Sequence, residues 1–151
     1  SFVGYSTLWL ARALPSHGQL ITIEADDHHA QMAQGFFEQS ECHSRITLLK
    51  GRALEQLPHL TNQRFDLVFI DAQKSEYLDY LQCVEPMIRV GGLIIGDNSL
   101  LFGAVHAEPQ QRVSAAATHA MRAFNKHLSD TTFYDAILLP TSEGLTIARK
   151  K

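Results

Sequence analysis

The stretch LVFIDAQKSEY at residues 67–77 joins an apolar run to a charged segment. Its strand portion, DLVFI at 66–70, is apolar on consecutive residues, as expected of a parallel strand that is covered on both faces. Asp71 follows this run, and Lys74 comes three residues later, just ahead of a predicted helix over 76–88. The stretch therefore predicts a central strand that delivers a carboxylate and an amine to one end of a sheet.

Strand-like and helix-like segments alternate on both sides of this stretch. The other predicted elements are strands over 20–24, 46–49 and 93–96, and helices over 6–14, 27–39 and 108–128. Such alternation with short connections is typical of an α/β fold with a parallel sheet. Further along, TFYDAILLP at 132–140 and GLTIARK at 144–150 predict an antiparallel β-hairpin at one edge of that sheet.

Length and composition limit the classes of protein. A chain of 151 residues that is 45% hydrophobic predicts one domain spanning residues 1–151. The net charge of −3 indicates no broad phosphate-binding surface, so DNA is not an expected partner, although a small RNA substrate stays open. Cys42 and Cys83 lie far apart without a partner motif, which fits reduced thiols. No apolar run approaches the roughly 20 residues of a membrane span, so we expect a cytoplasmic protein with no membrane partner.

Oxygen-bearing side chains follow several of the predicted strands. In an open α/β sheet, ligands bind beyond the carboxyl ends of the strands, so Glu24, Asp71 and the pair Asp97–Asn98 are expected to converge on one edge. Carboxylate and amide oxygens are the ligands that Mg²⁺ prefers. The alternative for Asp97 and Asn98 is that they form a turn or a helix cap.

Lys74 stands in an unusual place for a cation, because the N-terminal end of a helix carries partial positive charge. A nearby divalent ion disfavours the charged form of an amine, and this suits Lys74 to act as a general base. The alternative is a solvated surface lysine that points away from the cleft.

Glu24 lies 20 residues after Gly4 in the segment GYSTLWLARAL. In nucleotide-binding βαβ units, an acidic residue at about this distance from a glycine turn binds the ribose hydroxyls. Nicotinamide and adenosyl-sulfonium cofactors both carry such a ribose, but the dinucleotides also need a G-x-G-x-x-G turn, of which only Gly4 is visible. Gly51 is either an ordinary turn glycine or lets an adenine approach the backbone near Ala53.

Several of these segments, in this order and spacing, resemble the metal-dependent class of S-adenosylmethionine O-methyltransferases, which includes catechol and caffeoyl-coenzyme A O-methyltransferases and bacterial relatives. The matching segments are GYSTLWLA (4–11), LITIE (20–24), FDLVFIDAQKSEYLDY (65–80), RVGGLIIGDNSLLFGAV (89–105) and LLPTSEGLTIARK (138–150). The combination of FIDAQK with GDN is the most specific part. The resemblance implies a Rossmann-like methyltransferase sheet, mostly parallel with a C-terminal antiparallel hairpin.

The resemblance also implies roles for individual residues. The implied metal ligands, for Mg²⁺ or another divalent cation, are Asp71, Asp97 and Asn98, and the implied catalytic base is Lys74. The implied contacts to S-adenosylmethionine are Gly4, Tyr5, Ser6, Glu24, Gly51, Ala53 and Asp71. The expected substrate is a hydroxylated small molecule of the catechol or phenylpropanoid kind, and a homodimer is an expected assembly.

Family members carry N-terminal helices and a first central strand before the segment that matches GYS. The resemblance therefore implies that this chain is N-terminally truncated and lacks that strand, so that 20–24 and 66–70 flank an empty slot with unpaired backbone groups. Alternatively, the two strands close up on each other, which would weaken cofactor binding. In both cases the activity of this chain is in question.

Three alternatives to a small-molecule methyltransferase stay open on the sequence. One is a relative that methylates a hydroxylated uridine in transfer RNA. Another is a nicotinamide-dependent oxidoreductase. The third is a remnant that folds or associates without catalysis.

Overall fold

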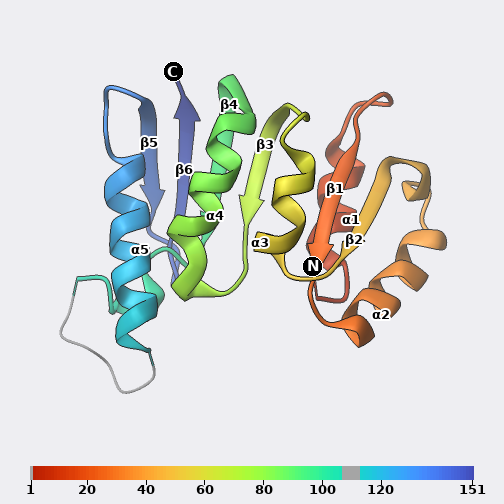
Figure 1. Cartoon of the computed structure of the whole chain (residues 1–151), viewed down its shortest axis with the longest axis horizontal. Helices are drawn as coiled ribbons and strands as arrows, with labels where there is room; N and C mark the ends of the chain where they lie inside the picture. Colours follow the sequence, from red (N-terminus) through yellow and green to blue (C-terminus); the bar gives the residue numbers. More distant parts are fainter. Residues whose placement is uncertain (1, 107–112) are drawn as a thin grey trace. The chain divides into compact units, whose positions relative to one another are not determined.

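The computed structural model describes residues 2–106 and 113–151 of the chain (Figure 1). The chain divides into two compact units, a first unit that ends at His59 and a second unit from Leu60 to Lys151. Each unit has its own sheet, with order β1-β2 in the first and β3-β4-β6-β5 in the second. The predicted α/β alternation is therefore present, in two sheets.

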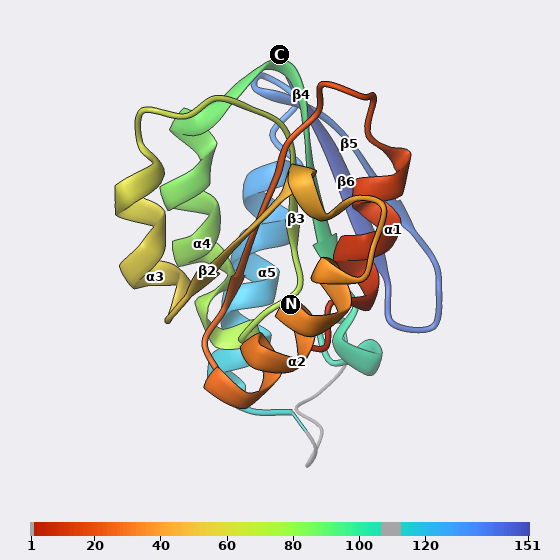
Figure 2. The ribbon, with the colours of Figure 1, turned by 90° about the vertical axis from the view of Figure 1, so that its right-hand side faces the viewer.

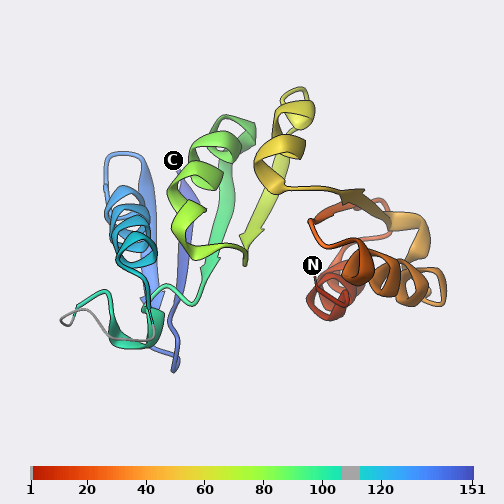
Figure 3. The same ribbon diagram turned by 60° about the horizontal axis from the view of Figure 1, so that its bottom comes forward.

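The first unit is built on two parallel strands. Its elements are α1 (Tyr5–Ala13), β1 (Leu20–Glu24), α2 (Asp27–Glu38), β2 (Ile46–Lys50) and α3 (Ala53–Gln56), with a 3₁₀ turn at His43–Arg45 and another that begins at Leu57. The strands pair in parallel, from Leu20 opposite Ile46 to Glu24 opposite Lys50. Helices α1 and α2 lie on the same side of these strands (Figure 2 and Figure 3).

Local signals in the sequence explain where the two helices of the first unit begin. Asp26 caps α2, because its side chain accepts a hydrogen bond of 2.8 Å from the backbone N–H of His29. Gly4 caps α1 in a left-handed conformation, with φ of 86°. A Cβ at this position would come within 2.5 Å of the ring of Phe37 on α2. Glycine is therefore required here both by the backbone conformation and by the close contact between α1 and α2.

The second unit carries a four-stranded mixed sheet. Its strands and helices are β3 (Phe65–Ile70), α4 (Tyr77–Val84), β4 (Ile88–Asp97), α5 (Ala115–Leu128), β5 (Tyr134–Leu139) and β6 (Leu145–Lys150), and its 3₁₀ turns are Lys74–Glu76, Glu85–Met87 and Leu101–Gly103. Strands β3 and β4 are parallel, whereas β6 is antiparallel to both β4 and β5. The predicted hairpin at the C-terminal end of the sequence is confirmed.

Helices α4 and α5 cover one face of this sheet (Figure 1). The fully buried side chains between the helices and the sheet include Ile94 of β4 and four residues of the helices: Tyr77, Leu81, Met121 and Phe124. Phe124 approaches β4 so closely that a Cβ at Gly96 would lie 2.6 Å from its ring. On α5, Ala117, Ala120 and Phe124 are buried at helical spacing and form the face that packs on the sheet, whereas Ala116 is exposed.

Two predicted helices have different bounds in the structure. The segment predicted as a helix over 76–88 is helical only from Tyr77 to Val84, because Pro86 lacks a backbone N–H and its ring clashes with the preceding turn. The helix predicted over 108–128 begins at Ala115, where Ser114 caps it by accepting a hydrogen bond of 3.1 Å from the N–H of Ala117. Residues 108–112 lie outside the described part of the chain.

The prediction that 66–70 forms a central strand covered on both faces is wrong for this sheet. Strand β4 pairs on both sides, but β3 pairs with β4 alone among the residues that the structure describes, so β3 is an edge strand. Leu67 accordingly keeps 38% of its surface exposed. Within residues 2–106 and 113–151, no helix combines the length and the apolar character that crossing a membrane requires.

Candidate active site

Asp71 and Lys74 form an ion pair at the carboxyl end of β3. Asp71 directly follows the strand and Lys74 opens the next 3₁₀ turn. The amine nitrogen Nζ of Lys74 lies 3.0 Å from Oδ1 of Asp71 and 2.7 Å from the hydroxyl oxygen of Tyr77. The side chain of Lys74 is 22% exposed, so the amine is held against the end of the strand and does not extend into solvent.

Tyr77 ties the ends of β3 and β4 together. Its buried hydroxyl lies 3.0 Å from the backbone oxygen of Ile70 and 2.9 Å from that of Asp97. Because the hydroxyl carries one proton, it shares that proton between the two carbonyls and accepts a hydrogen bond from Lys74. Burial, together with the nearby carboxylates of Asp71 and Asp97, raises the pKa of Tyr77 well above its ordinary value. Tyr77 therefore stays neutral and acts as a fixed anchor for Lys74.

Asp97 and Asn98 stand at the end of the neighbouring strand, β4. The carboxylate oxygen Oδ1 of Asp97 accepts a hydrogen bond of 2.8 Å from the backbone N–H of Asn98. Asn98 has a left-handed backbone with φ of 54°, and its side-chain nitrogen donates to the carboxylate of Glu143. The oxygen of the same amide accepts no hydrogen bond from any described residue.

The donor set at these strand ends fits a hydrated divalent ion. Asp71 and Asp97 offer carboxylates and Asn98 offers an amide oxygen, which are hard ligands of the kind that Mg²⁺ combines with water. Tyr77 links the ends of the two strands that carry them. In the part of the chain that the structure describes, no three side chains of the types His, Cys, Asp and Glu group closely enough to hold a metal. Any metal here would therefore depend on the amide of Asn98 and on water.

Glu24 occupies the corresponding position in the first unit, at the carboxyl end of β1. Its two carboxylate oxygens accept hydrogen bonds from the backbone N–H groups of Asp26, at 3.0 Å, and Phe2, at 2.5 Å. Burial alone would raise the pKa of Glu24, but its hydrogen-bond donors hold that pKa below its ordinary value. The backbone oxygen of Glu24 accepts from the N–H of Gly51 at 2.9 Å, which joins the ends of β1 and β2.

The other residues predicted to contact a cofactor all lie in the first unit. Gly4 is buried, whereas Tyr5 and Ser6 are exposed in the first turn of α1. Gly51 follows β2, and Ala53 is the first residue of α3. The hydrogen bonds from Phe2 and Gly51 to Glu24 bring the segment before α1 and the turn after β2 to the same end of β1.

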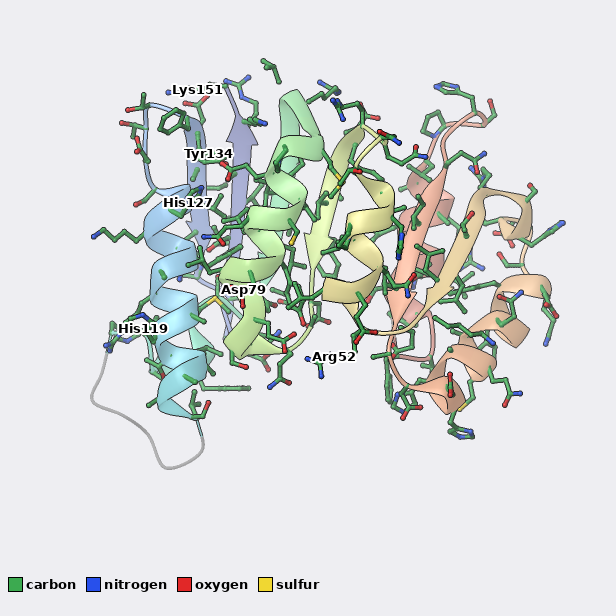
Figure 4. The ribbon with its side chains drawn as sticks, viewed as in Figure 1. Arg52, Asp79, His119, His127, Tyr134 and Lys151 are labelled. Atoms are coloured by element: carbon green, nitrogen blue, oxygen red, sulfur yellow. The ribbon has the colours of Figure 1, made fainter. Side chains whose placement is uncertain are left out.

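A second polar cluster lies in the second unit, around Glu85, which comes just before β4. The carboxylate of Glu85 accepts a hydrogen bond from the hydroxyl of Tyr134 and lies 3.1 Å from Nε2 of His127. Figure 4 shows His127 on α5 close to Tyr134 on β5. Lys150 donates to the backbone oxygen of Glu85 at 2.8 Å. This cluster marks the amino end of β4, the end opposite to Asp97, and joins α5 to the hairpin.

Tyr77 and Glu143 are site residues that the sequence reasoning missed. Tyr77 carried a usable signal, since it stands three residues after Lys74 and so falls on the same side of a helical turn. Glu143 carried no local signal. It meets Asn98 only because β6 pairs with β4 in a register that sets Leu145 opposite Asp97.

Comparisons with known proteins agree on one family. Residues 1–151 match the family model described as O-methyltransferase. A catechol O-methyltransferase of Niastella koreensis is 38% identical over 142 residues and is matched over 92% of this chain and 63% of its own length. A catechol O-methyltransferase of Mycobacterium tuberculosis is 34% identical over 124 residues, with 82% of this chain and 56% of its own length matched. This chain thus spans less than two thirds of the length of both curated relatives.

A solved structure extends the likeness to three dimensions. The O-methyltransferase from Bacillus cereus in complex with SAH (S-adenosylhomocysteine) is 32% identical to this chain and superposes with a TM-score of 0.91. The superposition covers 99% of this chain and 70% of that one.

Proposed function

The chain belongs to the O-methyltransferase family, and from that premise we propose that it carries a single S-adenosylmethionine-dependent methyltransferase domain. Its substrate is a small molecule with a catechol-like or phenylpropanoid-like hydroxyl, and its reaction depends on Mg²⁺ or a similar divalent cation. The observation that carries this proposal is the position of Lys74, whose amine is held between Asp71 and Tyr77 at the end of β3.

The reaction requires a nucleophilic oxygen at neutral pH. A phenolic hydroxyl has a pKa of about 10, so it is a poor nucleophile until its proton is removed. We assign that proton transfer to the amine of Lys74, which Tyr77 orients. When bound, a divalent ion supplies positive charge that favours the phenolate, and S-adenosylmethionine supplies the methyl group.

The proposed binding roles follow the geometry of each unit. Asp71, Asp97 and Asn98 would hold the divalent ion through their oxygens, and Asp71 would also contact the cofactor. In the first unit, the cofactor-binding role falls to Gly4, Tyr5, Ser6, Glu24, Gly51 and Ala53. The carboxylate of Glu24 suits ribose hydroxyls, because an ionised carboxylate accepts hydrogen bonds from hydroxyl groups and this one stands at the carboxyl end of β1.

The test is a pair of measurements on this chain. Calorimetric titration with S-adenosylmethionine should show binding, whereas titration with NAD should show none. Methyl transfer to catechol should then require Mg²⁺ and stop when the ion is chelated. Binding of NAD in place of S-adenosylmethionine would overturn the cofactor assignment, and turnover that persists in excess chelator would overturn the metal requirement.

Substrate class is tested in the same assay. Catechol offers two adjacent hydroxyls that can be oriented together, so it should be methylated faster than phenol, which has one. Transfer RNA as the only methyl acceptor would replace the small-molecule proposal with the RNA alternative. A cytoplasmic location and a homodimer also belong to the proposal, and cell fractionation and light scattering would test them.

A further inference from the structure

We propose that Glu143 is a positioning residue that fixes the side-chain amide of Asn98 with its oxygen toward the divalent ion. This inference rests on the proposed function, because it assumes that the oxygens of Asp71, Asp97 and Asn98 form the ion site. Glu143 itself does not touch the ion or the reacting atoms; it acts through Asn98.

The chemistry of the contact decides which end of the amide faces Glu143. A side-chain amide has a carbonyl end that only accepts hydrogen bonds and an NH₂ end that only donates them. An ionised carboxylate only accepts, so it can pair with the NH₂ end alone. The side-chain nitrogen of Asn98 donates to the carboxylate of Glu143, so the carbonyl oxygen, at the other end of the planar amide, points away from Glu143. That oxygen has no hydrogen bond from the described residues, so it is available to a cation.

Hydrogen bonds from the loop after β4 hold the backbone that carries Glu143 in place. The N–H of Leu100 donates to the backbone oxygen of Glu143 at 2.8 Å, and the N–H of Ser99 donates to that of Gly144 at 3.1 Å. A third hydrogen bond joins α5 to the loop after β4, since the side-chain nitrogen of Asn125 donates to the backbone oxygen of Ser99 at 2.8 Å. The turn before β6 and the loop after β4 are thus joined by backbone hydrogen bonds next to the contact between the two side chains.

The loop that carries Asn98 needs such support. Three of its non-glycine residues have left-handed backbones, with φ of 54° at Asn98, 46° at Leu101 and 54° at Phe102. This conformation is unfavourable for residues with a Cβ and persists only where surrounding contacts hold it. The turn before β6 therefore holds the backbone of this loop, while the carboxylate of Glu143 selects the orientation of one side chain within it.

The experiment measures binding of Mn²⁺, the probe ion, from the electron paramagnetic resonance signal of the free ion, without cofactor or substrate. Glu143→Ala frees the amide to rotate, so the dissociation constant for Mn²⁺ should rise by roughly 10- to 100-fold, the usual effect of losing a residue that orients a ligand. Glu143→Gln keeps an acceptor oxygen and should bind Mn²⁺ much as the unaltered chain does. Ser142→Ala, an exposed change in the same turn, is the matched control and should have no effect.

A second background separates orientation from support of the turn. In Asn98→Asp both ends of the side chain are oxygens, so no orientation remains to be selected. Glu143→Ala should therefore lower Mn²⁺ affinity much less in this background than beside Asn98, because only one nearby negative charge is lost. Equal losses of Mn²⁺ affinity in the two backgrounds would overturn the inference in favour of a structural or charge effect of Glu143.

The remaining outcomes distinguish the inference from the proposal beneath it. Equal losses in Glu143→Gln and Glu143→Ala would overturn orientation and make the charge of Glu143 the relevant property. A loss in Asn98→Ala without any loss in Glu143→Ala would overturn the role of Glu143 alone. Equal Mn²⁺ binding by Asn98→Ala and the unaltered chain would overturn the proposed ion site and the role of Glu143 with it.

Discussion

The carboxyl ends of two parallel strand pairs, β1 with β2 and β3 with β4, differ in what lines them. At the first, the carboxylate of Glu24 accepts hydrogen bonds from the backbone N–H groups of Phe2 and Asp26, and a glycine follows β2. At the second, charged and polar side chains bind one another around the buried hydroxyl of Tyr77. The same topology therefore places a single carboxylate with backbone donors at one end, and an ion pair anchored by a buried hydroxyl at the other.

The largest expected effect is at Lys74. Lys74→Ala should lower the rate of methyl transfer by about 10²–10⁴-fold, the usual contribution of a general base. Affinity for S-adenosylmethionine should fall far less than the rate, because the substitution keeps Asp71 and every proposed cofactor residue of the first unit. Initial rates and calorimetric titration measure the two quantities, with Lys126→Ala, an exposed lysine on α5, as the control. Full turnover by Lys74→Ala would remove the base assignment.

The second prediction concerns the stability of the first unit, in which Gly4 begins α1. Gly4→Ala should cost about 1–2 kcal/mol for the left-handed backbone and about 1–3 kcal/mol for overlap with the ring of Phe37. Gly35 on α2 is the matched control, since a Cβ there meets nothing within 4 Å, and Gly35→Ala should stabilise the helix by up to about 1 kcal/mol. Urea unfolding followed by circular dichroism measures both. Equal effects of the two substitutions would contradict this account of α1.

Substitution of Glu24 should lower the affinity for S-adenosylmethionine and leave the affinity for Mn²⁺ unchanged. Glu24→Gln replaces an oxygen acceptor with a donor and removes a charge, so affinity for S-adenosylmethionine should fall by about 1.5–3 kcal/mol. Affinity for Mn²⁺ should not change, because Glu24 belongs to the first unit. Parallel titrations of the two ligands measure this difference. Loss of Mn²⁺ affinity in Glu24→Gln would break the distinction between the two strand ends.

Removal of the Tyr77 hydroxyl should lower both the free energy of unfolding and the rate of methyl transfer. Tyr77→Phe keeps the ring against Phe124 but removes the hydroxyl from the carbonyls of Ile70 and Asp97. We expect a loss of about 1–3 kcal/mol in the free energy of unfolding, together with slower methyl transfer. Tyr5→Phe is the control, since Tyr5 is 70% exposed and its change should leave stability unaltered. Unaltered stability in Tyr77→Phe would show that the hydroxyl does not join the two strands.

The smallest effect concerns acid stability at Glu85. Burial acts to raise the pKa of Glu85, but hydrogen bonds from Tyr134 and His127 lower it below its ordinary value. A carboxyl whose pKa is lowered by folding stabilises the native state above its ordinary pKa, and this contribution disappears as the pH falls through the lowered value. Urea unfolding from pH 7 to pH 3 should therefore show Glu85→Gln less stable at pH 7 and converging with the unaltered chain in acid. A constant difference across this range would contradict the assignment.

The strands and the overall fold were largely readable from the sequence. Apolar runs located the strands, and the likeness to the Bacillus cereus enzyme confirms the Rossmann-like methyltransferase fold. The apolar spacing over 76–88 predicts a longer helix than the structure has, because helical spacing continues past the point where Pro86 ends the helix. The edge position of β3 could not be read from the sequence either, since a continuous apolar run indicates burial and not the number of paired neighbours.

The candidate site was readable only where it is local in sequence. Asp71 and Lys74 stand three residues apart, and the structure brings them into contact. Asp97 and Asn98 are adjacent and follow a strand that the apolar run predicts. Glu143 lies 45 residues from Asn98, and their contact depends on the pairing register of β4 and β6, which no short motif encodes. The roles of these site residues toward a metal or a substrate stay predictions.

The position of β6 affects the order in which the second unit can be assembled during synthesis. Strand β6 lies between β4 and β5 in the sheet, although it follows both in the chain. About 50 residues separate the end of β4 from the start of β6, so at about 5–20 residues per second the ribosome needs roughly 2–10 s to produce the missing neighbour. During that interval, one edge of the apolar strand β4 has unpaired N–H and C=O groups that can pair with another nascent chain. Protection of β4 from aggregation should therefore matter most while the ribosome is synthesising the residues between Asp97 and Leu145.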